Sequence, residues 1–262
     1  MRPLLEFRQG GPPVEARPAA TVVLLREAPT GFEVFCVERS GKSSFLAGAL
    51  VFPGGRLDPE DHAWAQAAGL PADAAYALAA IRETLEEAGI LLADRETPAL
   101  HADEIEAHRA AVLAGASLRN LLDEAGLVPA VQALVPFSRW VTPEAEAKRF
   151  DTAFFIAKAP ADQPGAHDRT ETVASLWATP ATLLERWQND EIAMVPPTHA
   201  TLEWLAARST LGAALEDAAR LAHDPIRPER RTEDGVPVLH LPGTHPYAPR
   251  YVLTSGRFSP RR

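Results

Sequence analysis

The chain has 262 residues, a formal net charge of −9, 46% hydrophobic residues and a single cysteine. This length supports one enlarged domain or a domain with an appendage, and we expect the first. The negative charge argues against nucleic acid and against an anionic membrane surface as partners. One cysteine excludes an internal disulfide. Because Cys36 lies in an apolar run, we expect a buried thiol and a reducing compartment.

The apolar runs and the two ends of the sequence bear on location. No apolar run approaches the roughly 18 residues that a membrane-spanning helix needs. The start, MRPLLE, lacks the apolar core of a signal peptide, and the end, SPRR, is no peroxisomal address. We therefore expect a cytoplasmic protein without membrane contact, and a homodimer is compatible with the sequence.

The first part of the chain predicts a lead-in followed by strands. Residues 1–17 are rich in proline and are expected to be irregular. Thr21–Leu25 and Phe32–Glu38 are β-branched and aromatic runs separated by a Pro-Thr-Gly turn, which predicts a hairpin. Leu50–Phe52 predicts a short strand that feeds a turn at Gly54-Gly55.

Two helices are predicted next. Asp58 precedes a proline and further acids, which is typical of a helix N-terminus, so we expect a short helix over Pro59–Ala68. A second cap at Asp73 predicts a helix over Ala74–Ala88, ended by Gly89.

The second of these helices has an apolar face and an acidic face. At about 100° of rotation per residue, the apolar stripe consists of Ile81, Leu85, Ala88 and Leu92. The opposite face, which we expect to be solvated, carries Glu83, Glu86 and Glu87. Like charges four residues apart cost about 0.2–0.5 kcal/mol, and Arg82 offsets this only in part. A divalent cation such as Mg²⁺ would supply the missing charge; the alternative is an ordinary solvated acidic surface.

These residues carry a resemblance to a known family. The run from Arg82 to Ile90, RETLEEAGI, resembles the second half of the Nudix box, R-E-U-x-E-E-x-G-U, where U is a bulky apolar residue. Only Thr84 departs from it. The run FPGG, which ends at Gly55, resembles the glycine loop that opens the same box.

The spacing inside the box is unusual. The complete pattern, G-x5-E-x7-R-E-U-x-E-E-x-G-U, separates the glycine from the arginine by 13 residues, whereas 26 residues (56–81) separate Gly55 from Arg82. The position of the first glutamate, eight before Arg82, holds Ala74. Either Asp73 or an acid of the Asp58–Asp61 run therefore takes its place as the partner of Arg82.

A second resemblance lies upstream of the glycine loop. Arg39-Ser40, Gly48 and FPGG are similar to R-[SA]-x3-R-x3-G-x3-F-P-G-G, the fingerprint of coenzyme A hydrolases within the Nudix family. Ser44 stands where the fingerprint has its second arginine, with Lys42 as a candidate substitute. The resemblance implies substrate contacts by Arg39, Lys42, Gly48 and Gly54. The alternative is that the two cations are solvated and that Gly48 only forms a turn.

The rest of the chain predicts further helices and strands. Helices are expected over Asp103–Leu113, Leu118–Ala125, Pro180–Gln188, Pro196–Ala207 and Thr210–Ala222. Strands are expected over Val131–Trp140, Phe150–Ala157, Val173–Trp177, Ile226–Arg231 and Val236–Leu241. The last two would form a hairpin before an irregular tail.

Residues 136–143 and 149–155, together with the interrupted box, are similar to the acyl-coenzyme A diphosphatase branch of the family. In this region Arg139 and Arg149 are candidate phosphate contacts. Many relatives place a further acid near the metals in the loop of Glu171, which makes Glu171 a candidate general base. Aromatic residues on these strands are expected to be core residues before they are adenine contacts.

The resemblance implies a Nudix α/β/α sandwich. A mixed sheet would lie between the helix over Ala74–Ala88 and the helix over Pro180–Gln188, with helical insertions at about 59–68 and 103–125. The Nudix domain would span residues 18–207, and a C-terminal helix, hairpin and tail over 208–262 would pack on it.

The implied reaction is metal-dependent hydrolysis of a pyrophosphate that links a nucleoside to another group. Mg²⁺ or Mn²⁺ would be held by the Gly55 carbonyl and the acids Glu83, Glu86 and Glu87. Arg82 would orient these acids, and Glu86 or Glu171 would take a proton from water. The expected substrate is coenzyme A or an acyl derivative, cut to (acyl-)4′-phosphopantetheine and adenosine 3′,5′-bisphosphate. The alternatives are a broad hydrolase of ADP-ribose, NADH or dinucleoside polyphosphates, and a domain that only senses a nucleotide.

Overall fold

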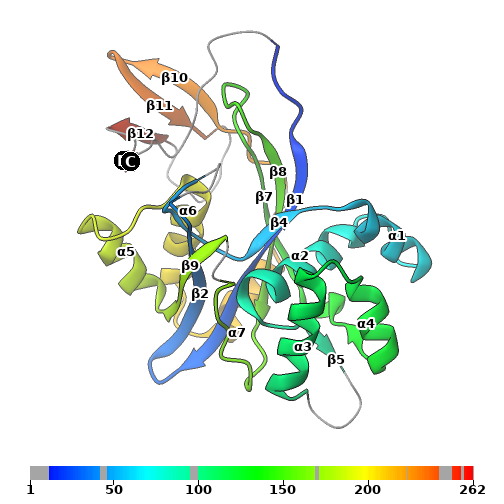
Figure 1. Cartoon of the computed structure of the whole chain (residues 1–262). Coiled ribbons are helices and arrows are strands. Elements are labelled where there is room, and N and C mark those ends of the chain that lie inside the picture. The colour runs from blue at the N-terminus through cyan, green and yellow to red at the C-terminus, as the bar shows by residue number, and fades with distance from the viewer. Residues whose placement is uncertain are drawn as a thin grey trace.

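The computed structural model describes residues 12–41, 46–94, 100–168, 171–222, 224–241, 250–254 and 257–261. The described part of the chain forms a seven-stranded mixed sheet with helices on both faces, and the C-terminal strands form a separate four-stranded sheet (Figure 1). The predicted α/β/α sandwich is confirmed. No helix among the described residues is long and apolar enough to cross a membrane.

The central strand is β1 (Arg17–Ala28), whose residues Val22–Leu25 are all buried. Along one edge β1 pairs in parallel with β8 (Phe150–Lys158). Its other edge is divided: the end of β1 forms the predicted hairpin with β2 (Gly31–Arg39), while its start pairs with β4 (Gly54–Arg56). Strands β1 and β2 thus diverge, and the glycine segment of β4 fills the space at the start of β1.

The outer strands complete the sheet. β2 also pairs with β3 (Leu50–Val51) and β9 (Thr172–Ala178), and β7 (Val135–Val141) pairs with β8. The register between β2 and β9 shifts after Glu38, so that Arg39 lies opposite Thr172. The strand predicted from Val131 begins four residues later because residues 131–133 form a 3₁₀ turn, η1 (Val131–Ala133).

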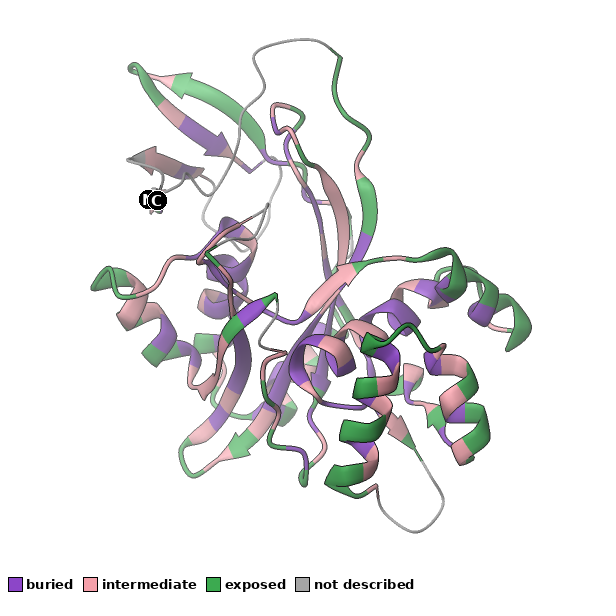
Figure 2. Ribbon diagram, in the orientation of Figure 1, coloured by how far each residue is buried: buried purple, intermediate pink, exposed green. Residues whose placement is uncertain are grey.

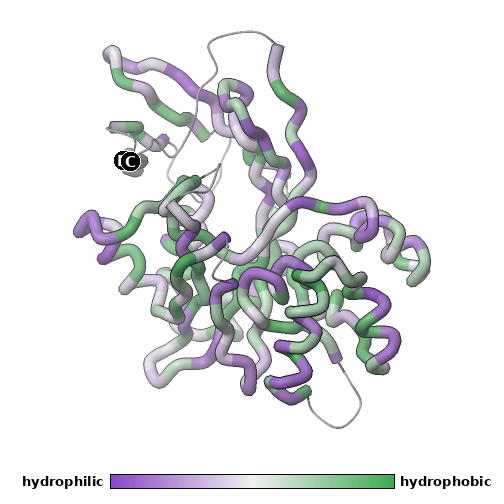
Figure 3. The backbone as a smooth tube through the Cα atoms, in the orientation of Figure 1, coloured by the Kyte–Doolittle hydropathy of each residue, from purple (hydrophilic) through white to green (hydrophobic). Residues whose placement is uncertain are grey.

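Two hydrophobic cores lie on opposite faces of the sheet (Figure 2). One core contains residues of α1 (Pro59–Ala67), α2 (Ala74–Ala88), α3 (Ala102–Leu113) and α4 (Leu118–Ala125). The other contains residues of α5 (Pro180–Gln188), α6 (Pro196–Ala206) and α7 (Leu211–Ala218). Hydrophobic residues follow the central strands, whereas the outer turns of the helices are largely hydrophilic (Figure 3). The predicted helical insertions are therefore confirmed as parts of the α2 layer.

The helix α2 has the predicted bounds, and Gly89 ends it in the left-handed conformation. A two-stranded ribbon of β5 (Ala93–Asp94) and β6 (Val128–Pro129) flanks α3 and α4. The helical insertion that contains α3 and α4 therefore leaves and rejoins the domain at one place.

The predicted C-terminal hairpin is present as β10 (Glu229–Glu233) and β11 (Val236–His240). The irregular tail predicted after it is wrong where the structure describes it, because β12 (Arg250–Thr254) and β13 (Arg257–Arg261) extend the antiparallel sheet there. Tyr251 is buried, and its ring lies edge-on to His199 of α6 at 5.7 Å. Phe258 joins the same core. Tyr251 of β12 thus packs on α6, a contact between distant parts of the chain.

Candidate active site

The glycine segment and α2 are in direct contact. In β4, Gly55 pairs with Ala20 and Gly54 pairs with Thr21. A Cβ atom on Gly54 would overlap the Ala20 carbonyl, and one on Gly55 would overlap the Glu83 carboxylate. At Gly54 the obstacle is the backbone of β1, and at Gly55 it is the end of the Glu83 side chain, which would have to move away from the segment. The two glycines of FPGG are therefore needed for two reasons: Gly54 lies against β1, and Gly55 leaves room for the Glu83 carboxylate of α2.

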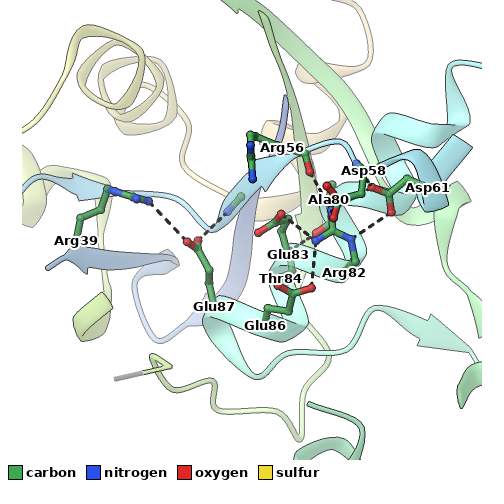
Figure 4. A network of polar contacts seen from close by, with 11 residues as sticks. Arg39, Arg56, Asp58, Asp61, Ala80, Arg82, Glu83, Thr84, Glu86 and Glu87 are labelled. Carbon is green, nitrogen blue, oxygen red and sulfur yellow. Dashed lines mark hydrogen bonds and ion pairs between the residues drawn. The ribbon is translucent and has the colours of Figure 1, made fainter. Parts of the chain in front are cut away.

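Glu87 is buried under this segment, with 5% of its surface exposed. The Gly54 N–H donates a hydrogen bond of 3.0 Å to Glu87 Oε2, and Arg39 Nη1 lies 3.7 Å from Glu87 Oε1 (Figure 4). Burial raises the pKa of Glu87 to about 8 although the Gly54 hydrogen bond opposes the shift. The prediction of a solvated acidic face is wrong here because β4 covers it.

Glu83 and Glu86 turn toward Arg82. Arg82 Nη1 donates to Glu83 Oε1 at 2.9 Å and to Glu86 Oε1 at 3.1 Å (Figure 4). Burial raises the pKa of Glu83 to about 7 and that of Glu86 above its usual range, although the charge of Arg82 opposes both shifts. Thr84, which departs from the box pattern, is buried, and its Oγ1 donates to the Ala80 carbonyl at 2.6 Å.

The partner of Arg82, left open by the sequence, is Asp61. Arg82 Nε and Nη2 donate to the two Asp61 carboxylate oxygens at 3.2 and 3.0 Å, and Nη2 also donates to the Arg56 carbonyl at 2.9 Å. Asp61 is 1% exposed and accepts a third hydrogen bond, from the Asp58 N–H, at 2.8 Å. Burial lowers the pKa of Arg82, but the hydrogen bond and charge of Asp61, with the charges of Glu83 and Glu86, outweigh burial and raise it.

A signal for Asp61 was present in the sequence. In the pattern G-x5-E, five residues separate the glycine from the acid. In this chain five residues (56–60) separate Gly55 from Asp61. The count from Arg82 backward reached Ala74 instead, because the inserted residues lie between the acid and the arginine. We call the following residues the acidic network: Arg39, Asp61, Arg82, Glu83, Glu86 and Glu87.

Arg39 is brought to this network from the end of β2. Its Nη2 lies 3.9 Å from Glu171 Oε2, so its guanidinium lies near both Glu87 and Glu171. Gly48 has a positive φ of 72°, and its N–H donates to the Arg39 carbonyl at 3.1 Å. This supports the alternative in which Gly48 forms a turn. Lys42 lies outside the described residues.

Glu171 is placed beside the acidic network by its backbone. The Ser40 N–H donates to the Glu171 carbonyl at 2.8 Å, and the Glu171 N–H donates to Asp168 Oδ2 at 2.8 Å. The charge of Glu171 contributes to the raised pKa values of Glu83 and Glu87. Asp168 was missed from the sequence, although an Asp that accepts from nearby backbone N–H groups is a common turn former.

The structure does not bring Arg139 and Arg149 into the acidic network. Arg139 of β7 forms a two-bond pair with Asp151 of β8 at 2.7 and 2.8 Å. Arg149 donates to the carbonyls of Thr142 and Val14 at 3.0 and 2.6 Å. Both arginines stabilise strand connections, and their assignment as phosphate contacts stays a prediction. The four aromatic residues of this region are buried as expected: Phe137, Trp140, Phe154 and Phe155.

The acids fit a divalent cation by their chemistry. Among the described residues, no three acidic, histidine or cysteine side chains converge as in a formed metal centre; Arg82 donates hydrogen bonds to Glu83 and Glu86, and the Gly54 N–H donates one to Glu87. Carboxylate oxygens are nevertheless the ligands that Mg²⁺ and Mn²⁺ prefer. The acids outnumber the arginines around them, and the raised pKa values of Glu83 and Glu87 reflect burial without enough positive charge.

A mixed sheet between helical layers, with a glycine strand under the carboxylates of a helix, defines the Nudix class of proteins. Residues 62–205 match the model of the NUDT19 Nudix domain, which is more than half of the chain. The crystal structure of a Nudix hydrolase from Alicyclobacillus acidocaldarius is 33% identical, with a TM-score of 0.66, over 77% of this chain and 96% of that one. The chain belongs to the Nudix hydrolase family, whose members generally use divalent metal ions.

Two curated relatives are both named acyl-coenzyme A diphosphatase NUDT19. The protein from Gallus gallus is 29% identical over 247 residues, which cover 69% of this chain and 65% of the relative. The protein from Homo sapiens is 27% identical over 249 residues, which cover 75% of this chain and 66% of the relative. The chain thus spans slightly less than two-thirds of the length of these relatives.

Proposed function

We propose that this chain is a metal-dependent diphosphatase of coenzyme A or acyl-coenzyme A. The products would be (acyl-)4′-phosphopantetheine and adenosine 3′,5′-bisphosphate. The observation that carries the proposal is the position of Arg39, the first residue of the coenzyme A fingerprint, which lies 3.7 Å from Glu87 and 3.9 Å from Glu171. A phosphate bound beside these acids would meet its guanidinium. The relatives named acyl-coenzyme A diphosphatase support the same substrate class.

In the proposed reaction, a water oxygen bonds to one phosphorus of the diphosphate while the bond from that phosphorus to the bridging oxygen breaks. Mg²⁺ or Mn²⁺, when bound, supplies positive charge that neutralises the diphosphate and the departing phosphate. The ligands we propose for it are the Gly55 carbonyl, Glu83, Glu86 and Glu87. Hydrogen bonds from Arg82 orient the carboxylates of Glu83 and Glu86, and a hydrogen bond from the Gly54 N–H orients that of Glu87.

Two residues are candidates for the general base, and their surroundings favour Glu171. The Glu86 carboxylate accepts a hydrogen bond of 3.1 Å from Arg82. The Glu171 side chain is 66% exposed, so water reaches it, while Asp168 and Ser40 hold its backbone. We therefore propose that Glu171 takes the proton of the attacking water.

A substrate panel at fixed Mg²⁺ tests the proposal. The ratio kcat/KM is measured for coenzyme A, a medium-chain acyl-coenzyme A, ADP-ribose, NADH and diadenosine tetraphosphate. We expect the coenzyme A pair to be preferred. Preference for ADP-ribose or NADH would favour the broad hydrolase, which Ser44 in the fingerprint's arginine position also favours. No turnover of any substrate by protein that binds metal would favour a nucleotide sensor.

A cytoplasmic location, which we propose from the single buried cysteine, and a homodimer stay predictions. Fractionation of cells and the mass of the purified protein in solution would test them.

A further inference from the structure

Arg109 is a buried arginine on α3, in the helical insertion, and it contacts α2. Only 5% of Arg109 is exposed. Its Nε and Nη2 donate to the backbone carbonyl of Glu86 at 3.1 and 3.0 Å. Its Nη1 lies next to Gly89, 2.9 Å from the position of a Cβ atom there. The guanidinium thus covers the C-terminal end of α2.

The carbonyl of Glu86 is one of the last carbonyls of α2, which lack partners within a helix. The Gly89 N–H bonds to the Leu85 carbonyl and the Ile90 N–H to the Thr84 carbonyl, so neither returns to Glu86. The two N–H groups of Arg109 supply the hydrogen bonds instead. The positive charge of the guanidinium also interacts favourably with the negative end of the helix dipole.

A second segment holds the same end of α2. The Ala166 N–H donates to the Ala88 carbonyl at 2.7 Å. The buried Gln163 side chain accepts from the Leu91 N–H at 2.7 Å and donates to the Leu91 carbonyl at 3.1 Å. These contacts fix where the chain leaves α2. Arg109 differs from them because it binds the residue whose carboxylate belongs to the acidic network.

We propose that Arg109 is a positioning residue of the active site: by holding the Glu86 carbonyl, it sets the last turn of α2 and hence the carboxylates of Glu86 and Glu87. The helical insertion then contributes to metal binding without touching the metal. This inference rests on the proposed function in one respect only, that these carboxylates bind a divalent cation. It does not depend on which diphosphate is hydrolysed.

The variants R109M and R109K test this in the full chain. R109M keeps the apolar stem and removes both hydrogen bonds, whereas R109K keeps the charge and can reach the carbonyl with one ammonium group. Mn²⁺ affinity is measured by calorimetry, and kcat, KM and Tm are measured in parallel. We expect R109M to weaken Mn²⁺ binding and to lower kcat by about 10-fold, the range typical of outer partners of metal ligands. KM should change little, and R109K should restore part of the loss.

A matched control is R208M. Arg208 also donates to a helix carbonyl, that of Trp204 in α6, at 2.5 Å, and Trp204 belongs to the other core. R208M should lower Tm while Mn²⁺ affinity stays at the wild-type value. Wild-type Mn²⁺ affinity and kcat in R109M would overturn the proposal. If R109M does not fold, R109K decides: full wild-type Mn²⁺ affinity and kcat would overturn it.

The outcomes separate this inference from the proposed substrate. If the wild-type protein binds Mn²⁺ but does not cleave coenzyme A, the proposed function is wrong. The comparison of Mn²⁺ affinity between wild type and R109M then still tests the role of Arg109. Wild-type protein that binds no Mn²⁺ would overturn the role of Arg109 as well.

Discussion

Arg82 and Arg39 both belong to the acidic network, but they are held differently. Arg82 donates hydrogen bonds of 2.9–3.2 Å to three carboxylates and one backbone carbonyl. Arg39 lies 3.7 and 3.9 Å from its two acids, which are ion-pair distances. We infer that Arg82 organises the ligands, whereas Arg39 exchanges its acids for a phosphate of the substrate. Loss of the first should lower kcat, and loss of the second should raise KM.

The acids that Arg82 and Gly54 orient should give the largest effects. E86Q and E87Q each remove a proposed metal ligand, so kcat should fall by more than the roughly 100-fold that loss of an outer partner can cost. The folded state should persist, because glutamine fills the same space without a buried charge. Turnover is measured at saturating substrate, with the exposed Glu216 changed to glutamine as the control. Turnover close to wild type in both variants would contradict the metal assignment.

The next largest effect is expected for Asp61, the buried acid that binds Arg82. D61N leaves the guanidinium without its buried carboxylate, so kcat should fall by about 10- to 100-fold and Tm should fall as well. D58N is the matched change three residues earlier. Asp58 is 56% exposed by its side chain and 3.8 Å from Arg82, so its loss should alter kcat by about twofold at most. Equal losses in the two variants would break the distinction between the buried and the exposed acid.

A smaller effect is expected for Arg39. R39M should lower kcat/KM for coenzyme A by about 10- to 100-fold, the value of a hydrogen bond to a charged group, chiefly through KM. R39K should lose less, because it keeps a charge near the phosphate. If R39M instead lowered kcat at unchanged KM, Arg39 would resemble Arg82, and the comparison between them would fail.

The smallest effect concerns stability and pH. The pKa values of Glu83 and Glu87, about 7 and 8, lie above the ordinary value near 4.5. Folding therefore favours their protonated forms, and this stabilisation, complete below pH 4.5, is lost as pH rises through 7 and 8. The Tm of metal-free protein should fall over pH 5–9, and E87Q should show a shallower fall. A Tm profile that is the same in wild type and E87Q would contradict the pKa values.

The sequence was sufficient for elements whose signals are local. The bounds of α2 followed from a preceding acid and a terminal glycine, and those of α4 from Ser117 and Gly126. The same reasoning could not show that β4 covers the acids of α2. The position of β4 depends on its pairing with β1, which is distant in the sequence. The solvated face was therefore predicted where Glu87 is in fact buried.

Contacts between distant segments explain the remaining differences. Asp61 was within reach of a count from Gly55, and Asp168 was within reach of a local turn signal, but Arg109 carries no pattern that points to α2. The strands β12 and β13 were missed for the same reason: Tyr251 and Phe258 are ordered by packing against the second core. Arg139 and Arg149 had the charge of phosphate ligands, and only the structure places Asp151 and backbone carbonyls beside them.

The contact between Asp61 and Arg82 also changes how the spacing of the box is understood. The intervening residues 62–81 form a closed excursion whose two ends meet. Lengthening such a loop from seven to twenty residues costs only about 0.9 kcal/mol of chain entropy. Burial of Trp64 and Ala65 against the core of α2 offsets a cost of this size. The motif thus requires that the acid and the arginine meet in space, and the number of residues between them can vary.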